Sequence, residues 1–150
     1  MDLAMLSGQL ALVIAAVFAG VAIYVSVCEH PARLKLDPRA MLIQWKPSYQ
    51  HGAAMQASLS LLGTILGSIA WWQTSHWLWL MGAVSLILPW PFTLFVIKPT
   101  NDELLATEPQ DAGPHSQALI EKWGHLHAVR TALGVLAAVL YLSASLSHSR

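Results

Sequence analysis

The chain alternates between long apolar stretches and shorter segments that carry most of its polar residues. Four apolar stretches stand out, at about residues 5–28, 53–72, 77–97 and 126–146. Each is about 20 residues long, the length that an α-helix needs to cross about 30 Å of hydrocarbon. A helix also satisfies its own backbone hydrogen bonds inside lipid. The pattern therefore predicts an all-α membrane protein with four transmembrane helices.

The connections between these stretches predict how the helices are arranged. A short turn, "QTSHW", joins the second and third stretches, and the other two connections are longer. This arrangement is typical of an up-down four-helix bundle, here a single domain over residues 1–150. Pro89 and Pro91 in "LPWPF" should kink or break the third span midway, because proline removes a helical hydrogen bond.

Two glycines in the second span, Gly63 and Gly67, have the spacing that lets transmembrane helices approach closely. The same spacing serves either packing inside one bundle or the interface of a homo-oligomer. We favour packing inside the bundle.

Composition supports the membrane assignment, since 55% of the residues are hydrophobic and only 11% are charged. Soluble domains usually carry about 25% charged residues. The formal net charge is zero, so the chain lacks the basic field that nucleic-acid binding requires. A single cysteine, Cys28, excludes an internal disulfide and a metal site made of cysteines alone. The expected partners are the lipid bilayer and hydrophobic small molecules.

The basic residues predict the orientation of the bundle. Those in or beside the two longer connections are Arg33, Lys35, Arg39, Lys46, Lys98, Lys122 and Arg130. Only Arg150 lies on the opposite side. The positive-inside rule therefore places the longer connections in the cytoplasm and both termini outside. Trp71, Trp72, Trp77 and Trp79 crowd the short turn, where we expect an aromatic belt at the outer interface.

Polar and aromatic residues gather where the spans meet the longer connections. They are Glu29 and His30 after the first span, Trp45 and Tyr49 before the second, Asn101 after the third, and Trp123, His127 and Arg130 at the start of the fourth. An up-down topology brings all of these positions to the same, cytoplasmic side. We therefore predict a polar pocket at the cytoplasmic ends of the helices.

Helical periodicity separates the two histidines of "EKWGHLHAVRT". At about 100° per residue, Trp123, His127 and Arg130 share one face of the fourth span, and His125 points nearly the opposite way. Gly134 and Tyr141 continue that face.

An arginine inside a transmembrane span costs free energy unless it pairs with an opposite charge or contacts water. We expect Arg130 to pair with Glu29, with Asp102 and Glu103 as alternatives; snorkelling to lipid phosphates is the other interpretation.

The segment "PTNDE" predicts a short helix at about residues 102–107. Thr100 or Asn101 would cap its first turn, with Glu103 completing a capping box. Capping explains Asn101 without a binding role, and both interpretations stay open.

The candidate chemistry rests on histidine and arginine. His127 and His30 can act as general bases, and Arg130 can stabilise an oxyanion. The substrate-binding candidates are Glu29, Trp45, Tyr49, Asn101 and Trp123. No cofactor is predicted, although His30 and His127 come from different spans and would be the ligands of a haem or a metal ion. The chain has neither a glycine-rich phosphate loop nor a serine nucleophile elbow.

Four segments resemble the DUF1772 family of small four-span, anthrone oxygenase-like membrane proteins. They are "EHPARL", "WKPSYQHGAAMQ", "PWPFTLFVIKPTN" and "LIEKWGHLHAVRTALG". The family motif positions carried over are His30, Asn101, Trp123, His127 and Arg130. The resemblance implies oxidation of a lipid-soluble aromatic substrate, anthrone- or quinol-like, by O₂ without a recognised cofactor. The "EHPARL" start is similar to bacterial members, which implies the bacterial inner membrane.

A non-enzymatic function is the alternative. The same pocket suits a membrane binding or accessory protein that holds haem, a quinone or a partner subunit. A minimal transporter half is disfavoured, because transport sites usually lie near the middle of the membrane and these spans have little polarity there.

Overall fold

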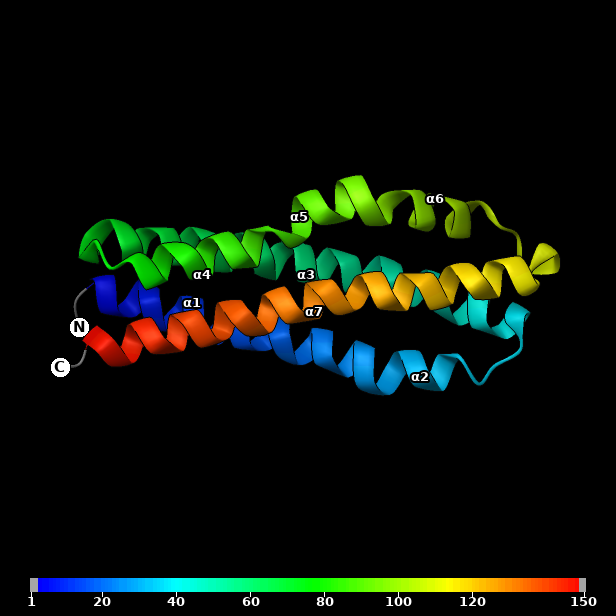
Figure 1. The fold of residues 1–150 in the computed structure, drawn as a ribbon, viewed down its shortest axis with the longest axis horizontal. Coiled ribbons are helices and arrows are strands. Elements are labelled where there is room, and N and C mark those ends of the chain that lie inside the picture. The colour runs from blue at the N-terminus through cyan, green and yellow to red at the C-terminus, as the bar shows by residue number, and fades with distance from the viewer. Residues whose placement is uncertain (1–2, 149–150) are drawn as a thin grey trace.

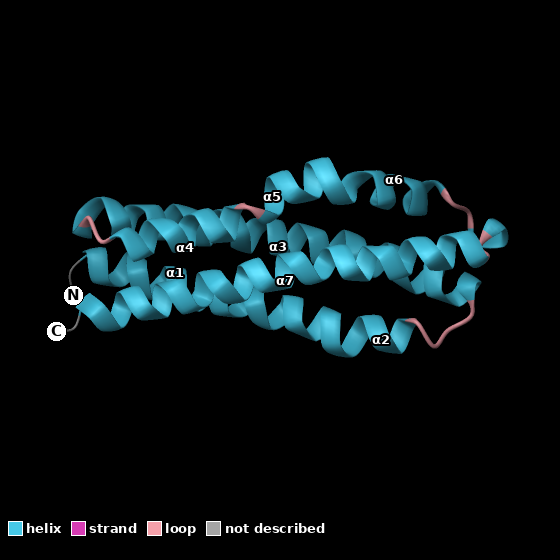
Figure 2. Cartoon of the chain, in the orientation of Figure 1, coloured by secondary structure: helices cyan, strands magenta, loops and turns pink. Residues whose placement is uncertain are grey.

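The computed structural model describes residues 3–148, which form four antiparallel helical rods with no β-strand among them (Figures 1 and 2). The first rod contains α1 (Leu3–Tyr24), the π-helix η1 (Val25–Glu29) and α2 (His30–Arg33). The second rod is α3 (Pro38–Thr74). The third contains α4 (Trp77–Ile87), α5 (Pro89–Phe92), the π-helix η2 (Thr93–Ile97) and α6 (Lys98–Ala106). The 3₁₀ turn η3 (Pro109–Asp111) leads to the fourth rod, α7 (Pro114–His148).

All four rods are long and apolar enough to cross a membrane, which confirms the predicted four-span membrane protein. The qualifying segments are Met5–Arg33, Pro38–Thr74, Trp77–Ala106 and Pro114–Ser147, each longer than the span predicted from sequence. At about 1.5 Å per residue, the 37 residues of α3 extend about 55 Å, well beyond the roughly 30 Å of a hydrocarbon core. The rods therefore reach out of the hydrocarbon.

The chain runs up and down between two distinct ends (Figure 1). The terminal end holds the N- and C-terminal regions and the α3–α4 turn. The opposite end, which we call the connection end, holds α2, α6 and the two longer connections. Asp37 starts α3 by accepting hydrogen bonds from the backbone N–H groups of Arg39 and Ala40, both at 3.1 Å. Ser75, in the left-handed conformation with φ 54°, ends α3 and lets the chain reverse.

Tyr141 of α7 packs closely against α3 in the terminal half of the bundle. Its hydroxyl donates to the backbone carbonyl of Gly63 at 2.9 Å. A side chain at Gly67 would overlap the Tyr141 hydroxyl, and one at Gly63 would collide with Leu86 of α4. Both glycines are therefore buried inside one bundle, as we favoured. The alternative that they form a homo-oligomer interface is wrong, because this face is already covered by the chain's own helices.

This close packing gives a first prediction on stability. Gly67→Ala should destabilise the bundle by about 1–3 kcal/mol, because the added methyl group overpacks against Tyr141. Gly20→Ala is the matched control, since a side chain at Gly20 would meet nothing within 4 Å. Thermal unfolding of both variants in the same detergent measures the difference. Equal unfolding temperatures for the two would contradict the packing argument.

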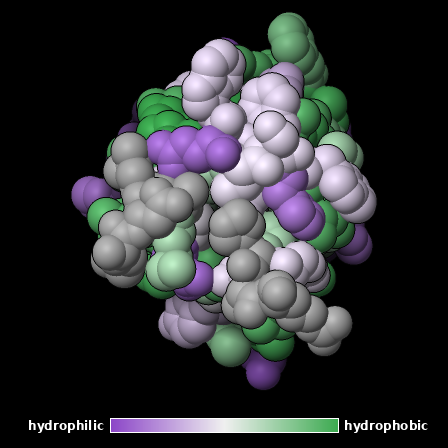
Figure 3. All heavy atoms as spheres, turned by 90° about the vertical axis from the view of Figure 1, so that its left-hand side faces the viewer, coloured by the Kyte–Doolittle hydropathy of each residue, from purple (hydrophilic) through white to green (hydrophobic). Residues whose placement is uncertain are grey.

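The terminal end carries exposed tryptophans but not the full belt predicted. Trp72 and Trp77 are exposed, whereas Trp79 is 3% exposed and packs on Tyr141 with ring centroids 5.5 Å apart. Trp79 is therefore a core residue, and its place in the belt was wrongly predicted. Figure 3 views this end and shows mainly pale and green residues, with several purple, hydrophilic ones among them. Arg150, the one basic residue predicted on this side, lies outside the described residues.

The third rod breaks where its prolines predict. α4 ends at Ile87, and α5 begins at Pro89 after the turn at Leu88. From this break onwards α5, η2 and α6 follow a line displaced outwards from that of α4 (Figure 1). The confirmed break thus moves half of the third rod away from α3.

Each π-helix ends two residues before a proline. The N–H of His30 donates to the carbonyl of Val25, and the N–H of Lys98 donates to that of Thr93. The following residues, Pro31 and Pro99, lack an N–H, and their rings crowd the carbonyl four residues back. A wider turn relieves this crowding. Such single π-turns are frequent at functional sites.

The second π-helix overturns the predicted helix cap. Residues 98–106 form one helix that continues from η2, so Thr100 and Asn101 lie inside α6 and are buried. Glu103 contacts His115 instead of closing a capping box. The cap prediction is wrong because the π-turn carries the helix through the proline that was expected to stop it.

Candidate functional site

A chain of aromatic contacts crosses the connection end of the bundle. Trp45 and Tyr49 stack on α3, with ring centroids 4.7 Å apart and an interplanar angle of 4°. Trp123 of α7 meets Trp45 edge-on at 5.9 Å and stacks with His127 at 5.0 Å. His30 contacts Trp123 from the first rod at 5.8 Å. Residues four apart on a helix lie on one face, which explains both the Trp45–Tyr49 and the Trp123–His127 pair.

Asn101 of α6 joins this chain through Tyr49. Its Nδ2 donates to the Tyr49 hydroxyl at 3.0 Å, and its side chain is almost fully buried. The two residues come from different rods, so this bond ties the displaced part of the third rod to α3. Asn101 is therefore a buried contact of the site and not a helix cap.

His127 is held by a relay of hydroxyl groups. Its Nδ1 lies 3.1 Å from the Ser26 hydroxyl, which lies 2.9 Å from the Thr131 hydroxyl. The Thr131 hydroxyl in turn donates to the carbonyl of Ala22 at 3.2 Å. Ser26 belongs to η1, so the first π-helix helps to orient the imidazole. His127 is 4% exposed.

Glu29 pairs with Arg33, and its predicted pairing with Arg130 is wrong. The Arg33 Nη2 atom lies 2.6 Å from Glu29 Oε1, one helical turn away. Gln44 and Ser48 of α3 also donate to this carboxylate, and Arg33 donates to Gln44. The Arg33 guanidinium lies over the Trp123 ring, 5.7 Å from its centroid.

The other expected partners of Arg130 are also engaged elsewhere. Asp102 pairs with Lys98 at 2.5 Å, and Glu103 pairs with His115 at 2.6 Å. Arg130 is 8% exposed, so it does not snorkel, and its Nε has no hydrogen-bond partner within residues 3–148. A buried guanidinium without a carboxylate partner is costly unless water or a ligand supplies the missing contact.

Arg130 lines two adjoining cavities. The central pocket has a volume of about 20 Å³ and lies among η1, α3 and α7, with Tyr49, Trp123 and His127 in its wall. The side cavity has a volume of about 160 Å³ and lies between α3 and the displaced α5–η2 segment. Ala53, Gln56 and Arg130 line both.

A third hollow opens on the flank of the bundle. It lies between the first rod and α3, has a volume of about 380 Å³, and includes Glu29, Val21 and Tyr24. It shares Val25, Ser48 and Gly52 with the central pocket. The central pocket is thus flanked by larger hollows on two sides.

Most of the buried polar atoms without a partner within residues 3–148 belong to residues of the connection half of the bundle, and two of these residues, Thr93 and Arg130, line the cavities. Within the described part of the chain they include Nδ1 of His30, Nη1 of Arg33, Nε1 of Trp45, Oγ1 of Thr93, Oδ1 of Asn101 and Nε of Arg130. Buried polar groups in proteins are nearly always hydrogen-bonded, so each such atom requires an explanation. A ligand or water in the side cavity would lie beside Thr93 and Arg130, the two residues of this set that line it.

Sequence reasoning missed Ser26, Arg33, Gln56 and Thr93. Arg33 follows Glu29 by four residues, the usual spacing of a helical ion pair. Gln56 continues the buried face of α3 defined by Trp45 and Tyr49, so a polar residue on an apolar face was a usable signal. Thr93 and Ser26 belong to the π-helices, whose altered register the periodicity did not reveal.

The donor set for a metal ion is limited. In residues 3–148 no group of three or more His, Cys, Asp and Glu side chains is placed to hold one. His30 and His127 both contact Trp123. Haem or metal binding by these two histidines stays a prediction.

These features define a multi-pass membrane protein whose four-helix bundle buries an aromatic and cationic site at one end. The chain belongs to the anthrone oxygenase family, whose model matches residues 45–140. The matched region includes the aromatic chain on α3, Asn101, and the Trp123–His127–Arg130 face of α7.

Three fungal relatives are similar to this chain. An anthrone oxygenase, dmxR16, of Cryptosporiopsis sp. (strain 8999) is 29% identical over 88% of this chain and 84% of its own length. An anthrone oxygenase of Claviceps purpurea is 27% identical over 69% of this chain and 67% of its own. The anthrone oxygenase ptaC of Pestalotiopsis fici is 28% identical over 71% of this chain and 86% of its own. No solved structure matches the chain.

Proposed function

We infer that this protein is a membrane oxygenase that oxidises a phenolic, anthrone-like substrate to a quinone with O₂. Family membership supports the reaction class. The observation that carries the assignment to this site is the position of His127, which lines the central pocket with Tyr49, Trp123 and Arg130. A base, a flat aromatic surface and a cation therefore converge on one small space.

The hydroxyl relay sets the tautomer of His127. The Thr131 hydroxyl has one hydrogen, and the carbonyls of Ala22 and His127, at 3.2 and 3.3 Å, can only accept it. Ser26 then donates to Thr131 and accepts from the Nδ1–H of His127. This assignment leaves a lone pair on Nε2 of His127. His127 is thus prepared to act as a general base.

The reaction balances without a further oxidant. His127 Nε2 removes one proton from the methylene carbon of the anthrone and leaves an enolate. This carbanion gives one electron to O₂, and the two radicals combine in a C–O bond. The resulting peroxide anion takes back the proton. Loss of the second hydrogen from the same carbon then breaks the O–O bond, releases water and leaves the quinone carbonyl.

The remaining site residues bind and orient the substrate in this proposal. Arg130 stabilises the enolate oxygen, because its charge is buried and without a carboxylate partner. Trp123 supplies an aromatic face of the central pocket, and Trp45 supports it edge-on from outside the pocket. The Tyr49 hydroxyl, which accepts from Asn101, can donate to a substrate oxygen. His30 packs against Trp123, and Glu29 acts through Arg33 as a positioning residue.

Turnover of an anthrone tests the proposal. Purified protein in lipid nanodiscs, supplied with a hydroxylated anthrone and air, should form the quinone faster than the uncatalysed rate and consume one O₂ per quinone. An absorption spectrum of the same sample distinguishes the binding-protein alternative, because bound haem would give a Soret band. A rate equal to the protein-free background would refute the oxygenase proposal.

We also propose that the connection end faces the cytoplasm. Seven of the eight basic residues lie at or near that end in the sequence, which supports the positive-inside prediction. Placement in a bacterial inner membrane stays a prediction, and the relatives named above are fungal.

A further inference from the structure

The side cavity lies beside the central pocket but has a different wall. Its lining comes from α3, from α5 and η2, and from Arg130 of α7. Pro89 forms part of this wall, and the break at Leu88 moves the following segment outwards (Figure 1). The cavity therefore exists because the third rod does not continue straight along α3.

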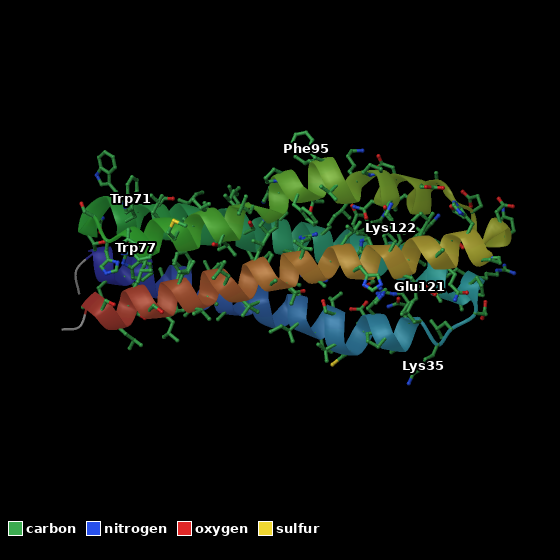
Figure 4. The ribbon with its side chains drawn as sticks, in the orientation of Figure 1. Lys35, Trp71, Trp77, Phe95, Glu121 and Lys122 are labelled. Atoms are coloured by element: carbon green, nitrogen blue, oxygen red, sulfur yellow. The ribbon has the colours of Figure 1, made fainter. Side chains whose placement is uncertain are left out.

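The cavity has an apolar rim that faces the surroundings of the bundle. Trp90 and Leu94 line it and are 39% and 54% exposed. The neighbouring Phe95 points outwards from η2 and is 81% exposed (Figure 4). Large exposed apolar side chains on a transmembrane rod contact lipid, so the opening faces the bilayer. A ligand that arrives here comes from the membrane and is itself hydrophobic.

The inner wall of the cavity includes polar residues, two of which have a buried atom without a hydrogen-bond partner within residues 3–148. Nε of Arg130 and Oγ1 of Thr93 are both buried without a hydrogen-bond partner among the described residues. Arg130 comes from α7 and Thr93 from η2, and both residues line the side cavity. Gln56 of α3, 3% exposed, completes this wall. A guanidinium and a hydroxyl together suit an acidic oxygen on an otherwise apolar molecule.

The volume of the side cavity limits the size of the ligand that it can enclose. An apolar cavity of about 150 Å³ accepts a benzene ring, so the 160 Å³ of the side cavity accepts one aromatic ring. A tricyclic substrate is too large to be enclosed there. The central pocket across the shared wall of Ala53, Gln56 and Arg130 has only about 20 Å³, room for a water-sized group, so the remaining rings extend towards the open rim.

We propose that the side cavity is the docking site for the oxygen-bearing ring of a phenolic polycyclic substrate, which reaches it from the bilayer between α3 and η2. Arg130 and Thr93 bind the ring oxygens, and the reacting carbon then lies towards His127. This inference rests on the proposed oxygenase function for the identity of the substrate. It assigns Ala57 and Thr93 as residues that determine substrate specificity.

Binding of 1,8-dihydroxyanthraquinone, a phenolic product analogue, tests this inference without turnover. Its visible absorption in nanodiscs reports binding, and unsubstituted anthraquinone is the probe without phenolic oxygens. Ala57→Phe fills the side cavity with a ring of its own and should weaken binding more than tenfold. Ala54→Phe is the matched control: Ala54 is exposed and lines none of the three hollows, so affinity should stay within twofold.

A second variant separates loss of binding from loss of folding. Thr93→Val keeps the side-chain volume and removes Oγ1. It should weaken binding of the dihydroxy compound about three- to tenfold, the effect of one hydrogen bond, and leave anthraquinone binding unchanged. If Ala57→Phe and Thr93→Val both bind the dihydroxy compound like the unmodified protein, the docking site is refuted.

The flank hollow offers the competing route. Val21→Trp fills that hollow from the first rod and should leave binding unchanged. A large loss in Val21→Trp, with none in Ala57→Phe, would place the substrate in the flank hollow and overturn the proposal. If turnover is normal but Ala57→Phe leaves binding unchanged, only the docking site is refuted. If Ala57→Phe weakens binding but the unmodified protein shows no turnover, only the oxygenase function is refuted.

Discussion

Replacing His127 with glutamine should lower the rate of quinone formation by about a hundredfold or more, the usual contribution of a positioned general base. Glutamine can still hydrogen-bond to Ser26, but its amide cannot take up a proton at neutral pH. The effect should fall on the turnover rate and leave binding of 1,8-dihydroxyanthraquinone within about threefold of the unmodified protein, because hydrogen-bond changes of this kind are modest.

The matched control is His125→Gln. His125 lies two residues away on the same helix and is exposed, as helical periodicity predicted. Its replacement should leave the rate unchanged, which separates loss of the base from a general effect of removing a histidine from α7. Ser26→Ala should give an intermediate loss, because the imidazole keeps its chemistry but loses the partner that fixes its tautomer. An unchanged rate in His127→Gln would exclude this residue as the base.

The second large effect is expected for stability. Glu29→Ala should destabilise the fold by about 3–5 kcal/mol, because it leaves a buried guanidinium without its counter-charge. The Arg33 side chain is only 1% exposed, and Glu29 is its ion-pair partner at 2.6 Å. Reversible unfolding in mixed detergent micelles measures the loss.

Two comparisons sharpen this test. Removing both partners, in Glu29→Leu with Arg33→Met, should recover most of the lost stability, because no buried charge is left unpaired. Asp102→Ala breaks the Lys98–Asp102 pair, which has the same spacing but is more than half exposed. This change should cost about 1 kcal/mol or less. Equal losses for Glu29→Ala and Asp102→Ala would show that the Glu29–Arg33 pair is effectively solvated.

The four spans could be predicted from sequence because length and hydrophobicity alone decide what crosses a membrane. The grouping of Trp123, His127 and Arg130 was predictable for a similar reason, since it depends only on the 3.6-residue period of one helix. Lys35, Glu121 and Lys122 lie towards the connection end, and Trp71 and Trp77 lie at the opposite one (Figure 4). These features depend on local pattern and topology, which the sequence carries directly.

Contacts that depend on exact helix register could not be predicted in this way. The pairing of Arg130 with Glu29 was inferred from depth alone, whereas Arg33 lies one turn from Glu29 and reaches it first. Asn101 was expected to cap a helix because a π-turn that continues through Pro99 leaves no periodic signal. The side cavity requires both the break before Pro89 and the path taken afterwards, and only the first of these follows from the sequence.

The π-helix at Val25–Glu29 changes the direction in which the later residues of the first rod face. One extra residue in a helical turn rotates everything that follows by about 100° relative to the residues before it. His30 meets Trp123 and fits against Gly124, where a side chain would overlap the imidazole, only in the shifted phase. A one-residue deletion in Val25–Glu29 would leave every residue of the site present in the sequence, yet would turn His30 and Arg33 away from α7. For comparison of related chains, the spacing between α1 and His30 is therefore as informative as the identity of the histidine.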